Sequence, residues 1–354
     1  MYDIILAFIT AFVVSYSAMP SIIRIAIDKG LCDLPGERRS HTAVTPSLGG
    51  IGIFVGLLFS IVFWTSFDKF GDLQYILCAI LVIAIIGVKD DIESISPYKK
   101  LYGELLAAII LVFKSNVKIT SFYGIFGIGD IPDAIAIPLS IFIIIVIINA
   151  FNLIDGINGL SGSIGLLVST IFGLWFYVTN NLVLAVLAFS LAGSILAFLK
   201  YNFTPAKIFM GDTGALLLGM VCSILSIKFI ELHKGLESPY AFKAVPAITV
   251  SILILPLFDT LRVFTMRILK GKSPFYPDRT HIHHLLIDAG FTHLKATTVL
   301  IMVNISLIAI AISLQDLGSL VLLILILVLA SIVTSVFFFM AAKKMKNDNK
   351  SFSA

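Results

Sequence analysis

Apolar runs of membrane-spanning length recur along almost the whole chain. A helix needs about 20 mostly apolar residues to cross the hydrocarbon core of a bilayer, and the sequence contains eleven such candidate segments. Of the 354 residues, 58% are hydrophobic and only 13% are charged, whereas soluble domains carry about 25% charged residues. The sequence therefore predicts an all-α polytopic integral membrane protein and excludes an ordinary soluble domain.

The expected crossings are separated by short polar loops. They cover residues 3–23, 47–66, 73–88, 101–117, 134–151, 160–178, 182–199, 214–230, 244–264, 296–314 and 317–340. The first has no Lys or Arg ahead of its apolar run and no small-residue cleavage pattern, so we expect a retained helix and not a signal peptide. We expect residues 1–342 to form a single transmembrane domain and residues 343–354 a short basic tail.

Lysine and arginine are distributed unequally between the two sets of loops. Only six of the 25 Lys and Arg residues fall on one side of the predicted topology, and the others fall on the opposite side. Cytoplasmic loops are enriched in these residues. We therefore predict an outside N-terminus, a cytoplasmic C-terminus and a location in the cell inner (cytoplasmic) membrane, where the basic face would attract anionic membrane lipids.

Five clusters of polar residues interrupt the apolar sequence. They occupy residues 33–50, 87–100, 149–162, 207–214 and 259–285, and counting the crossings places all five on the predicted cytoplasmic side. Polar residues at membrane helices are costly and usually serve a function. The pattern predicts an active site formed by cytoplasmic loops that acts on an anionic substrate.

Carboxylates mark two of these clusters at helix ends. Asp90 and Asp91 are adjacent, and their mutual repulsion favours neutralisation by a divalent cation or by cationic side chains such as Lys100. A solvated helix end is the simpler interpretation, and an aspartate-rich prenyltransferase would need a second acidic pair that is missing here. Asp212 could be an ordinary helix cap. Its return to the same face as the Asp90–Asp91 pair instead indicates a Mg²⁺-diphosphate pocket.

Asn149, Asn152 and Asp155 recur at intervals of three residues, which places them on one face of a helix. Their amides and carboxylate would point into one polar pocket. A hydrogen-bonded helix cap would account for Asn158 but not for this row of three. We therefore interpret the row as part of a binding site.

Three histidines, His281, His283 and His284, follow Arg279 closely. They could bind zinc, but no cysteine accompanies them and the guanidinium would oppose a cation. Charged hydrogen bonds to diphosphate oxygens suit imidazole and guanidinium groups better. In the first cluster, His41 and its neighbouring arginines could equally be anchors on the positive side of the membrane.

Taken in order, these motifs resemble those of the polyprenyl-phosphate N-acetylhexosamine-1-phosphate transferases over residues 33–285. The motifs are Asp-x-Pro-x-x-Arg-x-x-His, Gly-x-x-Asp-Asp, Asn-x-x-Asp-Gly-x-x-Gly-Leu, Phe-Met-Gly-Asp-x-Gly and His-x-His-His. The last motif is similar to that of the WecA and TagO branch. The branch that transfers phospho-N-acetylmuramoyl-pentapeptide has three adjacent histidines and is the alternative.

The resemblance implies transfer of N-acetylhexosamine 1-phosphate from a UDP-N-acetylhexosamine, with UDP-GlcNAc as the expected donor, to undecaprenyl phosphate. UMP would be released, and the reaction would initiate a cell-surface polysaccharide with Mg²⁺, or Mn²⁺, as cofactor. The resemblance implies metal binding by Asp212 and Asp155. It implies catalytic roles for Asp90, Asp91, His281, His283 and His284, and substrate binding by His41, Lys100, Asn152, Asp155, Asn158 and Arg279.

Asn158 departs from the family pattern, which usually has a second aspartate three residues after Asp155. An amide can accept a hydrogen bond from a nucleobase but brings no charge, so this difference concerns nucleotide affinity. Outside the enzyme class, a transporter of an anionic substrate is the alternative, although transporter sites lie near the bilayer midplane in broken helices. We expect no nucleic-acid partner, and the sequence leaves a homodimer open.

Overall fold

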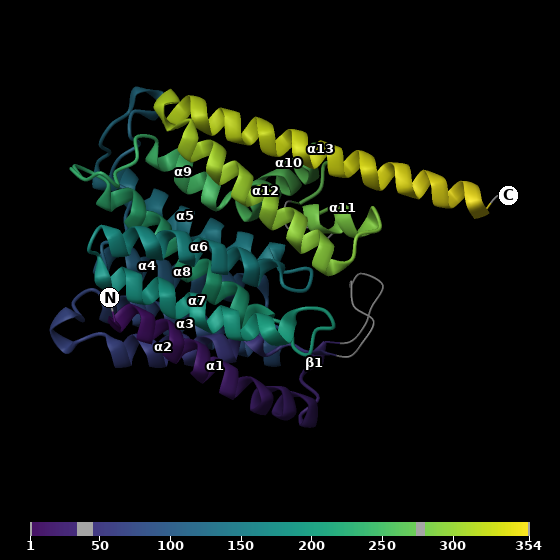
Figure 1. The fold of residues 1–354 in the computed structure, drawn as a ribbon, viewed down its shortest axis with the longest axis horizontal. Coiled ribbons are helices and arrows are strands. Elements are labelled where there is room, and N and C mark those ends of the chain that lie inside the picture. Colours follow the sequence, from purple (N-terminus) through teal and green to yellow (C-terminus); the bar gives the residue numbers. More distant parts are fainter. Residues whose placement is uncertain (1, 34–44, 274–279, 353–354) are drawn as a thin grey trace.

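The computed structural model describes residues 2–33, 45–273 and 280–352, which form a bundle of helices (Figure 1). The helices are α1 (Tyr2–Asp28), α2 (Gly49–Trp64), α3 (Leu73–Ile92), α4 (Pro97–Lys114), α5 (Asp133–Ile154), α6 (Leu160–Val178), α7 (Leu182–Asn202), α8 (Gly211–Leu232), α9 (Val245–Ile252), α10 (Ile254–Leu269), α11 (Ile282–Asp288), α12 (His293–Ser313) and α13 (Ser319–Phe352). Two-residue strands, β1 (Cys32–Asp33) and β2 (Thr45–Pro46), pair antiparallel. The all-α prediction is confirmed.

Several helices are long and apolar enough to cross a membrane. Seven of the described helices meet both criteria, and the bent pair of α9 and α10 would raise the number to eight. Helix α2 is apolar but shorter, at 16 residues. The protein is therefore a multi-pass membrane protein, while the count of eleven crossings and the orientation of the termini stay predictions.

The expected crossing over residues 244–264 consists of two helices, α9 and α10. The axes of α9 and α10 differ by 82°, a bend that the sequence analysis did not predict, while the crossing itself stays a prediction. Breaking a helix inside a membrane leaves carbonyl groups without partners. Asn304 of α12, which is fully buried, donates from Nδ2 to the carbonyl oxygens of Ser251 at 3.4 Å and Ile252 at 3.3 Å.

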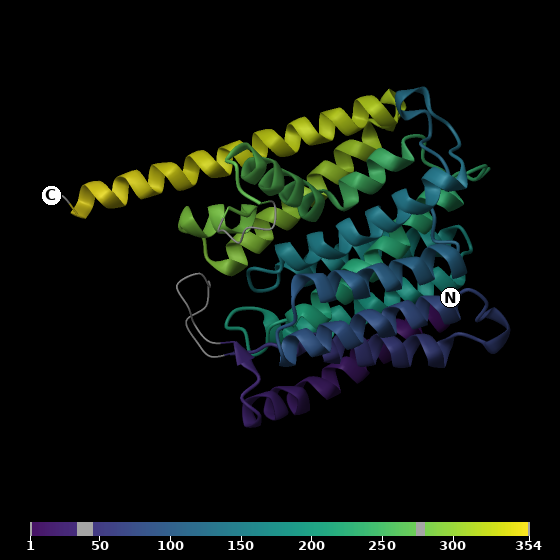
Figure 2. The ribbon, with the colours of Figure 1, turned by 180° about the vertical axis from the view of Figure 1, so that it is seen from behind.

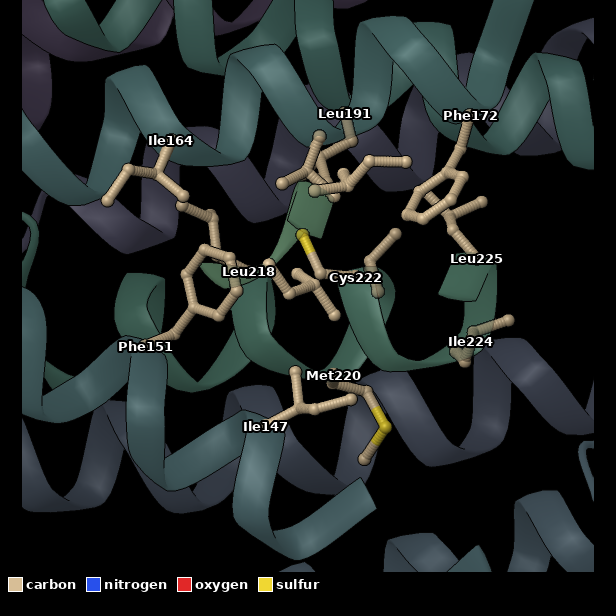
Figure 3. Packing of buried hydrophobic residues seen from close by; sticks show 14 of the residues in the cluster. Ile147, Phe151, Ile164, Phe172, Leu191, Leu218, Met220, Cys222, Ile224 and Leu225 are labelled. Atoms are coloured by element: carbon tan, nitrogen blue, oxygen red, sulfur yellow. The ribbon is translucent and has the colours of Figure 1, made fainter. Parts of the chain in front are cut away.

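Helix α8 is the centre of the bundle. In its most apolar stretch 83% of the residues are buried, against 28% for α1 and for α13. Side chains from α5, α6 and α7 surround it, and Figure 3 shows Phe151, Ile164 and Leu191 packed around Leu218 and Cys222. Because α8 is enclosed on all sides, the position of Asp212 at its N-terminal end is well fixed.

Different segments of the chain lie at the two ends of the bundle. Figure 1 places β1, α11 and the C-terminal end of α13 at one end and the chain's N-terminus at the other. Ion pairs fasten loops far from that first end: Lys118 with Asp133 at 2.6 Å and Lys234 with Asp130 at 2.9 Å.

Helix α13 extends past the other helices (Figure 2). Because it runs from Ser319 to Phe352, the predicted basic tail, which starts at residue 343, begins as a continuation of this helix.

Candidate active site

Asp212 lies at the start of α8 and is the centre of a network of charged and polar side chains. Its Oδ1 atom accepts hydrogen bonds from Lys100 Nζ on α4 and from Asn152 Nδ2 on α5. The same ammonium group lies 3.2 Å from Asp90 Oδ2 on α3. Four helices, α3, α4, α5 and α8, thus bring two carboxylates, an amide and a cation together.

Asp91 has different partners from its neighbour Asp90. It accepts hydrogen bonds from the backbone N–H groups of Asp212 at 2.7 Å and Thr213 at 3.0 Å, and from Thr213 Oγ1 at 2.6 Å. The first N–H groups of a helix lack partners within the helix and favour a carboxylate. Asp91 therefore caps α8 from another helix and fixes the position of Asp212.

Two glycines allow the backbone segments of the site to approach closely. A Cβ atom on Gly50 would lie 2.0 Å from the backbone nitrogen of Gly214, and one on Gly87 would lie 2.4 Å from Thr213 Cα. Gly50 N–H also donates to Met210 O at 2.8 Å. The end of the first cluster is thus bound directly against the segment that carries Asp212.

The C-terminal end of α5 carries the predicted row of polar residues, and each has a different partner. Asn149 Nδ2 donates to Glu104 Oε2 at 2.6 Å, and Asn152 reaches Asp212 as described above. Asp155, the residue after α5, accepts a hydrogen bond from Ser161 Oγ. Burial raises the pKa of Asp155 to about 6, the Ser161 hydrogen bond opposes this rise, and the negative charge of Asp212 adds to it.

Asn158 ties the loop after α5 to two other segments. Its Nδ2 donates to Thr204 Oγ1 at 3.3 Å, its backbone N–H donates to His293 Nδ1 at 3.4 Å, and its carbonyl accepts from Thr297 Oγ1 at 3.0 Å. The amide is therefore compatible with a role in holding the loop. Its predicted contact with a nucleotide stays a prediction.

The histidines approach the same loop from α11. His281 Nδ1 lies 2.8 Å from Asp259 Oδ2 on α10. The rings of His281 and His283 stack with centroids 5.7 Å apart, and those of His283 and His284 are 4.3 Å apart. His283 lies against Gly156, where an added Cβ would be 2.1 Å from Nε2. The row of imidazoles therefore ends beside the loop that carries Asp155.

His283 is fully enclosed, with 1% of its surface exposed. Burial lowers its pKa well below the usual value, and the neighbouring His284 lowers it further. Its Nδ1 atom has no hydrogen-bond partner among the described residues. A neutral ring in this position packs against the loop and is poorly suited to carry positive charge.

Most of the predicted site residues lie in this region. The network and its borders include Asp90, Asp91, Lys100, Asn152, Asp155, Asn158, Asp212, His281, His283 and His284. His41 and Arg279 fall outside the described residues, so their predicted substrate contacts stay predictions. The individual catalytic, binding and metal roles of the others also stay predictions.

Two buried acidic residues in the site were given no role from the sequence. Glu104 is 1% exposed and lies one helical turn from Lys100 on the same face of α4, and Asp259 is 1% exposed beside the histidines. A detectable signal existed for Glu104, because it is a lone carboxylate inside an apolar run, where a charged group is costly.

The donor set fits a magnesium ion. Mg²⁺ is usually held by one or two carboxylates together with waters and substrate phosphate oxygens. Asp90 and Asp212 already converge on one cation, the ammonium group of Lys100, and Asp155 is near enough to be affected by the charge of Asp212. No three His, Cys, Asp or Glu side chains among the described residues form a ready-made metal site, so substrate oxygens would have to complete the coordination.

Comparison with known proteins agrees with this geometry. The family model described as Glycosyl transferase family 4 matches residues 73–230, which include α3 to α7, all but the last two residues of α8 and the whole Asp212 network. A Bacillus subtilis (strain 168) protein named as a probable undecaprenyl-phosphate N-acetylglucosaminyl 1-phosphate transferase is 31% identical over 310 residues, covering 86% of this chain and 83% of the relative.

Two further relatives have similar names. The undecaprenyl-phosphate alpha-N-acetylglucosaminyl 1-phosphate transferase of Salmonella typhi is 31% identical, over 77% of this chain and 73% of its own length. The decaprenyl-phosphate N-acetylglucosaminephosphotransferase of Mycobacterium tuberculosis (strain CDC 1551 / Oshkosh) is 28% identical, over 84% and 79%. With this degree of identity over most of both chains, the protein belongs to glycosyl transferase family 4.

Proposed function

We propose that the protein transfers N-acetylglucosamine 1-phosphate from UDP-N-acetylglucosamine to a polyprenyl phosphate, with undecaprenyl phosphate as the expected acceptor. UMP and a polyprenyl-diphospho-sugar would be the products. The observation that carries this proposal is the convergence of Asp90, Lys100, Asn152 and Asp212 in one network. The names of the three relatives support the sugar and the lipid class.

The network suits the meeting of two phosphate-bearing substrates. A phosphate monoester has a second pKa of about 6, so the acceptor is largely a dianion at neutral pH and needs no strong general base. The difficulty is repulsion between this dianion and the donor diphosphate. Lys100 can donate a charged hydrogen bond to a phosphate oxygen, and His281 can donate a further hydrogen bond. Asp90 and Asn152 can position the groups around Asp212.

Mg²⁺ is the cofactor in this proposal, with Asp212 and Asp155 as its protein ligands and Mn²⁺ as a substitute. When bound, it would screen the repulsion and stabilise charge on the leaving UMP. We place the site at the cytoplasmic face of the cell inner membrane, because most of the Lys and Arg residues fall on the side of the polar clusters. The product would initiate a surface polysaccharide.

The test is a product assay with purified protein. Undecaprenyl phosphate, Mg²⁺ and a panel of UDP-sugars are supplied, and the released nucleotide is identified. We expect UMP with UDP-N-acetylglucosamine. Release of UDP would instead show glycosyl transfer, and uptake of unchanged substrate into vesicles would support the transporter alternative.

A second assay separates one displacement from two. We propose direct attack by the acceptor, whereas the alternative makes Asp90 or Asp155 a covalent nucleophile. Exchange of one phosphoanhydride for another predicts under either scheme that added UMP and lipid-linked product regenerate UDP-sugar. Direct transfer alone predicts that no labelled phosphosugar stays on the protein without acceptor. A trapped phosphosugar-enzyme species or ping-pong kinetics would exclude direct attack.

A further inference from the structure

The carboxylate of Asp259 holds the ring of His281 in a buried position. Asp259 is 1% exposed and His281 is 6% exposed. Oδ2 of the aspartate and Nδ1 of the imidazole are 2.8 Å apart. Because the second ring nitrogen, Nε2, is not used by this contact, the carboxylate determines which nitrogen is available to a substrate.

Asp259 is itself fixed by groups on both sides of it. Its Oδ1 atom accepts hydrogen bonds from Arg262 Nη2 at 2.8 Å and from the backbone N–H of Ile282 at 2.9 Å. The same guanidinium nitrogen donates to the carbonyl of Thr280. The carboxylate cannot rotate without losing these bonds, so the His281 ring has one orientation relative to α10.

The position of His281 connects this arrangement to the active site. Its ring stacks on His283 with an angle of 8° between the planes, and His283 lies against Gly156, next to Asp155. With a proton on each ring nitrogen, Nδ1–H donates to the Asp259 carboxylate, and Nε2–H is left to donate a charge-assisted hydrogen bond to a phosphate oxygen.

Building on the proposed function, we propose that Asp259 is a positioning residue for the reaction. It holds His281 through Nδ1, so that Nε2–H of this histidine donates to a phosphate oxygen of the bound substrates. Arg262 completes the arrangement by holding Asp259 and the backbone at Thr280. His281 is then the histidine that binds phosphate, whereas His283 supports the loop by packing.

Two substitutions at His281 distinguish its ring nitrogens. The side-chain amide of Gln places its nitrogen near the position of Nε2, whereas the shorter amide of Asn places it near Nδ1. We expect His281→Gln to lose no more kcat/KM for UMP release than Asp259→Asn does, because both variants lose the contact between residues 259 and 281 and keep a donor near the position of Nε2. We expect His281→Asn to lose about 10- to 100-fold, the effect of one charged hydrogen bond. Equal losses, or a greater loss in His281→Gln, would overturn the proposal.

His233 provides the matched control for these variants. It is also 6% exposed and its Nδ1 contacts Phe229 O at 2.7 Å, but it lies at the C-terminal end of α8, at the opposite end of the bundle from Asp212. His233→Gln and His233→Asn should release UMP at the wild-type rate per folded protein. A difference between these two variants as large as that at His281 would point to a general packing effect and count against the proposal.

A double-mutant cycle tests the role of Asp259. In the wild-type background Asp259→Asn should lower kcat/KM, because one amide oxygen cannot accept from Arg262, Ile282 and His281 together. In the His281→Gln background the same change should add little further loss. Equal losses in both backgrounds, in proportion to a fall in Tm, would show that Asp259 only anchors α11.

The outcomes separate this proposal from the proposed function. A wild-type protein that releases no UMP would contradict the function. A wild-type protein that releases UMP, with His281→Asn as active as His281→Gln, would contradict only the role of His281 and Asp259. If Asp259→Asn does not fold, the comparison of the two His281 variants decides the question alone.

Discussion

Two adjacent aspartates have separate roles because of helix geometry. Successive residues of an α-helix point about 100° apart, so Asp90 faces Lys100 while Asp91 faces the N-terminal end of α8. The sequence predicted the same catalytic role for both. It could not reveal the difference, because the partner of Asp91 is the backbone of a residue more than 100 positions away.

Removing the Asp91 carboxylate should lower the stability of the protein as well as its rate of UMP release. Asp91→Ala leaves the N–H groups of Asp212 and Thr213 without their partner, and we expect a loss of about 1 to 3 kcal/mol in the free energy of unfolding. Asp90→Ala should reduce UMP release with a smaller fall in Tm. Thermal unfolding in detergent and initial rates check this.

Thr213→Val is the matched control for Asp91, because it removes one of the three hydrogen bonds to the carboxylate and keeps the two from the backbone. Its loss of stability should be the smaller one. If Asp91→Ala kept the wild-type Tm, the capping role would be wrong.

Asp155 predicts a pH dependence of stability. Its pKa of about 6 in the folded protein exceeds the unfolded value of about 3.9. Between these values the folded protein keeps a proton that the unfolded chain has released, so stability falls as pH rises through this window. At about 1.4 kcal/mol per pKa unit, the loss is at most about 3 kcal/mol.

The measurement is Tm against pH from 4 to 7 in metal-free buffer, for wild type and Asp155→Asn. We expect the variant to gain stability relative to wild type as pH rises, because its amide does not ionise. A difference in Tm between the two proteins that stays constant across this range would show that ionisation of Asp155 does not cause the pH dependence of stability.

At the scale of the elements, the periodic apolar segments predicted most helices well. The bend in the ninth segment, residues 244–264, was not predicted, although Pro256 indicates that a new helix begins there. This proline lies in the first turn of α10, a position that tolerates proline, whereas a helix interior does not. The sequence could not settle the matter, because Pro20 and Pro138 lie inside α1 and α5, which remain continuous.

The contact between α11 and the loop after α5 should be sensitive to the size of residue 156. In Gly156→Ala the new Cβ would lie 2.1 Å from His283 Nε2, so the imidazole row or the loop must move. We expect UMP release to fall by about 10-fold or more, since small displacements of catalytic groups are costly, while the helical fold is kept.

Gly129→Ala is the matched control, because nothing lies within 4 Å of a Cβ at this position. It should be as active as wild type. Wild-type activity in Gly156→Ala as well would show that the packing of His283 against the loop does not matter for the reaction.

At the scale of the whole molecule, counting crossings predicted that distant clusters meet at one face. The structure brings Gly50, Asp91, Asn152 and Asp212 into direct contact or into contact through one neighbour. The sequence could not predict which atoms pair, because helix packing sets those distances. It also could not assign Glu104 and Asp259 to the site, since each finds its partner on another element.

The predicted sidedness can be tested by labelling. Lys69, which precedes α3, and Lys99, in the first turn of α4, are both exposed and are assigned to opposite sides of the membrane. In intact cells a membrane-impermeant thiol reagent should label Lys69→Cys, and it should label Lys99→Cys only after permeabilisation. The unsubstituted protein, with its native cysteines, is the control. The reverse pattern would invert the orientation, and the active site would then face outward.

The bend between α9 and α10 is held from outside by Asn304, a residue that touches neither the carboxylates nor the histidines in the contacts described above. The two hydrogen bonds from its amide to the carbonyls of Ser251 and Ile252 favour the observed angle between α9 and α10. This angle determines where Asp259 on α10 lies. A substitution of Asn304 in α12 would therefore change the angle of α10 and, through Asp259, the position of His281, although Asn304 touches neither residue in these contacts.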